Sequence, residues 1–108
     1  MRIDILGTEY ELIETTEQED VRLDGHDGWC GIYDKEILIE KNIFPNCHES
    51  TIELSRSERS KYAKRHEIVH AYFNESGLDN YSANEQLVAW IAVQFPKMLK
   101  TFQAAGCI

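Results

Sequence analysis

The chain has 108 residues, 43% of them hydrophobic and 28% charged, and its formal net charge is −8. This composition predicts a single globular domain over residues 1–108, with no apolar run long enough to cross a bilayer. The acidic balance disfavours a surface that binds polyanions, so nucleic acid is not an expected partner. The lack of a long apolar run makes a membrane equally unexpected.

The amino-terminal residues and the cysteines both indicate a cytoplasmic protein. The run Met1–Leu6 is short and contains an acid, which is not typical of a secretory signal. Cys30, Cys47 and Cys107 are widely spaced and form no C-x-x-C pair. We therefore expect free thiols in a reducing compartment.

Two segments alternate apolar and polar residues in the manner of β-hairpins. Residues 3–12 alternate around a turn at Gly7-Thr8, and residues 28–33 and 36–40 flank a short turn at Asp34-Lys35. The stretch 15–27 collects acids and is predicted to be an exposed loop. Together the hairpins predict a small antiparallel sheet.

A helix is predicted to follow the second hairpin. Residues 42–50, with their turn chemistry, would cross from sheet to helix, and Ser55–Glu58 fits a capping box that begins it. The helix would run to about Glu75 and stop at Gly77. Its predicted inward stripe is Tyr62, His66, Val69 and Phe73.

A second helix is predicted after a loop at 78–81. Ser82–Glu85 has the form S-x-x-E at its start, and the small Ala89 and Ala92 permit a close approach to the first helix. Pro96 is expected to kink or restart it. The predicted fold is therefore α+β: two hairpins, then two helices.

The first helix carries the pattern H-E-x-x-H at His66, Glu67 and His70. One turn separates the two imidazoles, so both can bind one metal ion. Glu67 projects about 100° away, too far for a comfortable ligand but suited to act as general base on a water. The competing interpretation is a surface helix with merely solvated side chains.

A hydrolytic zinc site needs a third protein ligand, and Glu85 on the second helix is the favoured candidate. The alternative is that Glu85 only completes its capping box. Tyr81, in the loop before Glu85, is a candidate to steady an oxyanion, whereas Tyr72 is expected to pack. Lower-ranked ligand candidates are Glu75, Asp79, His26, His48 and Cys30, the last of which is expected to be a core residue.

The segments Lys64–Ala71, Glu75–Leu78 and Asn84–Ala92 resemble small phage or prophage zincin-like proteins related to the ImmA/IrrE metallopeptidases, and more distantly SprT-like proteins. The resemblance implies a minimal zincin-like fold with one zinc ion on His66, His70 and Glu85, and Glu67 as base. It further implies a cytoplasmic metallopeptidase of a bacterial host cell that hydrolyses an unidentified protein or peptide. The alternative is a non-catalytic zincin-fold adaptor or inhibitor of phage origin; a purely structural metal is less attractive because three ligands leave a position open.

Overall fold

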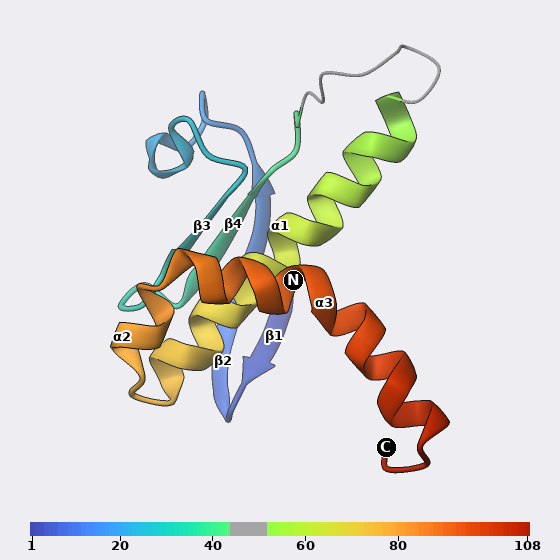
Figure 1. Cartoon of the computed structure of the whole chain (residues 1–108). Helices are drawn as coiled ribbons and strands as arrows, with labels where there is room; N and C mark the ends of the chain where they lie inside the picture. The colour runs from blue at the N-terminus through green and yellow to red at the C-terminus, as the bar shows by residue number, and fades with distance from the viewer. Residues whose placement is uncertain (44–51) are drawn as a thin grey trace.

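The computed structural model describes residues 1–43 and 52–108, and the side chains of residues 52–54 are not described. It has the predicted α+β architecture, a sheet covered by helices (Figure 1). The strands are β1 (Arg2–Ile5), β2 (Thr8–Thr15), β3 (Gly28–Gly31) and β4 (Glu36–Glu40). The helices are the 3-10 turn η1 (Val21–Leu23), α1 (Ile52–Glu75), α2 (Asp79–Ser82) and α3 (Glu85–Ala104).

The sheet is mixed, with strand order β1-β2-β4-β3. Both predicted hairpins are confirmed, since β1 pairs with β2 and β3 with β4 in antiparallel register. The prediction of a wholly antiparallel sheet is wrong, because β2 and β4 pair in parallel, from Glu11 opposite Glu36 to Thr15 opposite Glu40. After β2 the chain crosses to the far edge and forms β3, and β4 then returns between β3 and β2. This order leaves β3 at an edge of the sheet.

Both hairpin turns differ slightly from the predicted positions. The first is Leu6-Gly7, whose φ values of 52° and 89° are both positive, as a two-residue turn matching the strand twist requires. The second connection is longer than predicted because β3 already ends at Gly31. Lys35, with φ of 56°, donates its backbone N–H to the Gly31 carbonyl over 3.0 Å.

The acidic stretch 15–27 is only partly the exposed loop that its composition predicts: Glu17, Glu19 and Asp24 are exposed, but the stretch also has an ordered, packed part. It contains η1, which packs on β3 and β4 and buries Leu23 completely. The guanidinium of Arg22 lies 4.7 Å from the centre of the Trp29 ring. The same guanidinium forms ion pairs with three carboxylates, those of Asp20, Asp34 and Glu36. Arg22 thus links the segment to the carboxylates of the β3–β4 hairpin.

Helix α1 lies between the sheet and α3 (Figure 1). Its most buried side chains, Ala63, Glu67 and Ala71, are spaced four residues apart and form one stripe. Ala63 and Ala71 pack with the sheet residues Ile5, Tyr10, Ile37 and Ile39. The predicted inward stripe through His66 is only partly buried, because the small alanines, and not the larger side chains, face the sheet. Glu67 is thereby placed in the interface with the sheet.

The carboxyl-terminal end of α1 is fixed to the sheet by Glu75. Its carboxylate accepts hydrogen bonds from the hydroxyls of Thr8 and Tyr10, at 2.9 and 2.7 Å, and pairs with the Lys35 ammonium at 2.6 Å. These donors, Lys35 first, lower the pKa of Glu75 to about 2. Glu75 is therefore a structural anchor and not a metal ligand, as its position on the helix predicts.

The helix boundaries correct three predictions. Helix α1 begins at Ile52, so Ser55–Glu58 lies inside the helix and is not its capping box; the predicted crossing at 42–50 falls mostly outside the described residues. The predicted loop at 78–81 forms most of α2. Helix α3 continues through Pro96, and Figure 1 shows the change of direction along it that a proline lacking its N–H predicts. None of the helices in the described ranges combines the length and apolar character needed to span a membrane.

Candidate metal centre

The two histidines of the motif lie one turn apart on α1 and face the same side. Their Nε2 atoms are 3.3 Å apart, and their side chains are only 17% and 14% exposed. Burial lowers the pKa of His70, and the neighbouring Glu85 carboxylate only partly opposes this effect. His70 is therefore held neutral near pH 7, the form in which an imidazole binds a metal.

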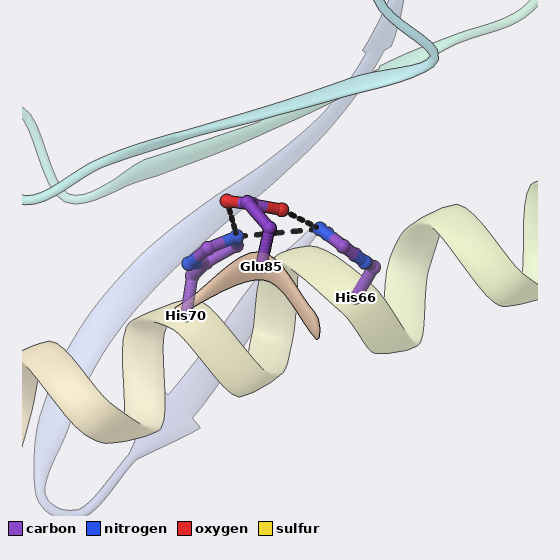
Figure 2. A group of neighbouring side chains, drawn as sticks. All are labelled: His66, His70 and Glu85. Carbon is purple, nitrogen blue, oxygen red and sulfur yellow. Dashed lines mark hydrogen bonds and ion pairs between the residues drawn. The ribbon is translucent and has the colours of Figure 1, made fainter. Parts of the chain in front are cut away.

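Glu85 comes from the start of α3 and completes the group (Figure 2). Its Oε2 lies 2.9 Å from His66 Nε2, and its Oε1 lies 3.0 Å from His70 Nε2. The interpretation of Glu85 as a capping-box residue is wrong, because Asn84 caps α3 by accepting a hydrogen bond from the Leu87 N–H at 3.1 Å. The Glu85 carboxylate does not cap the helix and points to the two imidazoles.

The spacing of these atoms fits a metal ion. A tetrahedral zinc ion with ligands at about 2.0–2.1 Å requires neighbouring ligand atoms about 3.3 Å apart. The candidate ligand atoms of His66, His70 and Glu85 all lie within 4.8 Å of one another. The 2.9 and 3.0 Å contacts with Glu85 are slightly short because they have the length of hydrogen bonds. A group of two imidazoles and one carboxylate suits zinc and other divalent transition metals, and leaves one tetrahedral position for water.

Glu67 lies beside this group, beneath the sheet edge. Glu67 is only 8% exposed, and its side chain lies directly against Gly28 of β3. Burial, with a smaller contribution from the Glu85 charge, raises the pKa of Glu67 to about 7. Within the described ranges no hydrogen bond or ion pair is assigned to its carboxylate. A buried acid without a partner next to a candidate metal group has the properties of a general base.

Two hydroxyl groups that the sequence did not indicate contact the far nitrogens of the histidines. Ser82, the last residue of α2, places Oγ 3.1 Å from His70 Nδ1, and the Tyr62 hydroxyl lies 3.3 Å from His66 Nδ1. In the sequence Ser82 fits a helix cap and Tyr62 an apolar stripe. The i, i+4 spacing of Tyr62 and His66 is the one sequence signal that could have indicated either contact. Ser82 gives no such signal, because it lies on a different helix from His70 and is brought close by the fold.

The remaining candidates lie elsewhere. Asp79 and His26 are exposed, and neither belongs to the metal group; His48 is outside the described residues. Cys30 is packed against the core as predicted, and burial raises the pKa of its thiol to about 12, which disfavours the thiolate that a metal would need. The ring of Tyr81 packs 6.0 Å from that of Phe73.

An apolar cavity of about 560 Å³ lies between α1 and α3, and Tyr72, which is 43% exposed, is one of the residues that line it. The cavity includes none of the four residues of the candidate centre, so the centre is defined by its ligand atoms and not by this hollow. Comparisons with known protein families, with curated protein sequences and with solved structures find no match to this chain.

Proposed function

We propose that this protein is a zinc-dependent metallopeptidase that hydrolyses peptide bonds of a protein or peptide substrate. The observation that carries the proposal is the convergence of three ligand atoms, from His66, His70 and Glu85, with a buried acid beside them. The ligand spacing and the open fourth position suit a catalytic metal better than a closed structural one.

The chemistry assigns separate roles to the residues. His66, His70 and Glu85 would hold the ion, which when bound supplies a Lewis acid that activates water and polarises a carbonyl. Glu67 accepts one proton as the water oxygen bonds to the carbonyl carbon. It then gives that proton to the amide nitrogen as the carbon–nitrogen bond breaks, so that a carboxylic acid and an amine are released.

The free edge of β3 supplies a binding place for an extended peptide. Among residues 1–43 and 52–108, β4 is the one strand that pairs with β3, and Gly28 of β3 lies against Glu67. A peptide that adds to this edge would be oriented by backbone hydrogen bonds and would pass beside the candidate base.

The resemblance of the motif segments to ImmA/IrrE-like proteins supports the same proposal. It favours the cytoplasm of a bacterial host cell as the site of action, and proteolysis of a regulatory protein as the analogous activity. Fold resemblance alone does not define a substrate, so the proposal is tested on the site.

Metal content is the first test. We expect the purified protein to contain about one zinc ion per chain by elemental analysis, and His70→Ala to lose it, because two remaining ligands hold zinc poorly. Tyr72→Ala, on the same helix but in the apolar cavity, is the matched control and should keep the metal. Equal, substoichiometric zinc in wild type and His70→Ala would contradict the ligand assignment.

Cleavage of fluorescein-labelled casein in the same preparations tests catalysis. Glu67→Gln should retain zinc and lose activity by about 10²–10⁴-fold, the contribution of a positioned general base. Cleavage that persists in Glu67→Gln removes Glu67 from the mechanism. A partner captured from host lysate equally by metal-stripped protein, and never cleaved, would instead support the adaptor.

Alanine at position 28 should misplace the base without removing the metal. An added Cβ on Gly28 would lie 2.8 Å from Glu67 Cγ and 3.2 Å from its Oε1, closer than ordinary contact. Because a displacement of about 1 Å costs on the order of 10²-fold in rate, we expect Gly28→Ala to lose casein cleavage at unchanged zinc content. Gly31→Ala, where the added carbon meets the Trp29 ring instead, is the control. Equal losses in both variants would trace the effect to the strand and not to Glu67.

A further inference from the structure

Ser82 contacts His70 on the side of the ring that faces away from the metal group. Ser82 is only 7% exposed. Its Oγ lies 3.1 Å from His70 Nδ1 and 3.4 Å from the backbone carbonyl oxygen of His70. The other ring nitrogen, Nε2, lies 3.0 Å from Glu85 Oε1. Both nitrogens of one imidazole therefore have polar neighbours, and the position of the ring proton must satisfy both.

Without an ion, the proton belongs on Nε2. A carboxylate only accepts hydrogen bonds, so the contact with Glu85 requires His70 Nε2–H as donor. In a neutral ring Nδ1 then carries a lone pair, and the Ser82 hydroxyl donates its hydrogen to it. In this arrangement the nitrogen that would bind a metal is blocked by its own proton.

With an ion, the arrangement must reverse. Metal binding uses the Nε2 lone pair, so the neutral ring carries its proton on Nδ1 and needs an acceptor there. The Ser82 oxygen can accept that hydrogen bond while its own hydrogen turns to the His70 carbonyl, which lies within reach. The number of protons on the imidazole and the hydroxyl is unchanged, and no buried group loses its partner.

We propose that Ser82 is a positioning residue whose hydroxyl reverses its hydrogen bond with His70 when a metal binds, donating to Nδ1 in the metal-free protein and accepting from it in the loaded protein. Only the part of this inference that concerns the metal-bound protein rests on the proposed function; the part that concerns the metal-free protein does not. A serine suits this task because a hydroxyl both donates and accepts, whereas a carboxylate in its place would fix the ring in one tautomer.

Tyr62 provides an internal comparison. Its hydroxyl approaches His66 Nδ1 at 3.3 Å, and no second hydrogen-bond partner is assigned to it in the described part of the chain. Its contact with the histidine is longer than that of Ser82, which makes it the weaker of the two. Ser82→Ala should therefore reduce zinc affinity by about 10–100-fold, the range for outer-shell partners of metal ligands, and Tyr62→Phe by less.

The experiment has a metal-free and a zinc-loaded arm. Long-range ¹H–¹⁵N correlation spectra of the imidazoles identify which nitrogen carries the proton. In the wild type we expect His70 to be the Nε2–H tautomer without metal and the Nδ1–H tautomer with zinc. In metal-free Ser82→Ala we expect the Nε2–H tautomer to persist, because Glu85 still requires it, but the Nδ1 resonance should shift because that nitrogen has lost the hydrogen bond donated by Ser82. Ser82→Thr, which keeps the hydroxyl, should restore the wild-type Nδ1 shift. Ser76→Ala is the control. Ser76 directly follows α1, and its exposed hydroxyl donates to the Tyr72 carbonyl of that helix.

The outcomes separate the two proposals. If the wild type binds zinc but Ser82→Ala binds it equally well, the role of Ser82 is overturned and the metal site stands. If metal-free wild type shows Nδ1–H, or the same Nδ1 chemical shift as Ser82→Ala, the hydrogen-bond arrangement is wrong whatever the metal does. If the wild type binds no zinc, the metal site and the loaded half of the inference both fail, and the metal-free spectra still decide the other half.

Discussion

Replacing Glu67 by glutamine is expected to raise the free energy of unfolding of the metal-free protein at pH 8 by about 2–3 kcal/mol. The physical reason is the burial of an unpaired carboxyl group against the sheet, which raises its pKa from 4.5 to about 7. A buried charge without a partner is costly, and glutamine removes that charge while keeping nearly the same shape. Retaining such a residue at the expense of stability is characteristic of a functional site.

The pH dependence gives this prediction its sign. Because the folded-state pKa of Glu67 is raised, its contribution to the free energy of unfolding is fully present below pH 4.5. That contribution is lost as the pH rises through 7. Glu67→Gln lacks that loss, so the difference between the two proteins should be near zero at pH 4.5 and largest above pH 7.

Urea unfolding in the presence of a chelator, at pH values from 4.5 to 8, measures the effect. Glu9→Gln is the control, because the Glu9 side chain is 66% exposed and should give a nearly constant, small difference. A Glu67→Gln protein that is less stable than the wild type at pH 8 would show that the carboxylate has a stabilising partner, and the case for a poised base would be lost.

The sequence predicts local features of this fold better than their arrangement. Period-two alternation around Ile3, Ile5 and Tyr10 defines a hairpin, because strand faces are set by neighbouring residues. Whether the second hairpin joins the first in parallel or antiparallel register depends on the path of residues 16–27. Composition describes that segment as acidic and does not reveal that Arg22 gathers three of the surrounding carboxylates.

The same distinction applies to the site. Helix geometry brings His66 and His70 together, and the S-x-x-E ambiguity at Glu85 is resolved only because Asn84 takes over the capping role. The structure brings the three predicted ligands together, while zinc binding itself stays a prediction. The pattern does not predict the burial of Glu67, because it places the His66 stripe inward, whereas Ala63 and Ala71 allow the sheet to approach along the neighbouring stripe. The contact between Ser82 and His70 cannot be predicted from spacing, because the two residues are twelve positions apart and lie on different helices.

Glu85→Gln is expected to have a small effect on stability without metal and a large one with zinc. In the metal-free protein the change should alter the free energy of unfolding by no more than about 1 kcal/mol, because the Glu85 side chain is 68% exposed and chiefly loses a favourable interaction with the start of α3. With zinc at 100 times its dissociation constant, the wild type should gain about 2.7 kcal/mol. A neutral amide oxygen is a poorer zinc ligand than a carboxylate, so most of this gain should disappear in Glu85→Gln.

Thermal or urea unfolding with and without zinc distinguishes a ligand from a bystander. Asp79→Asn is the matched control: Asp79 is also an exposed acid in the first turn of its helix, it lies outside the metal group, and it was the competing ligand candidate in the intervening loop. Full zinc stabilisation in Glu85→Gln together with its loss in Asp79→Asn would transfer the third ligand to Asp79. Loss in Glu85→Gln alone would establish that the start of α3 closes the metal group, and that the packing of α3 on α1 is what creates the site.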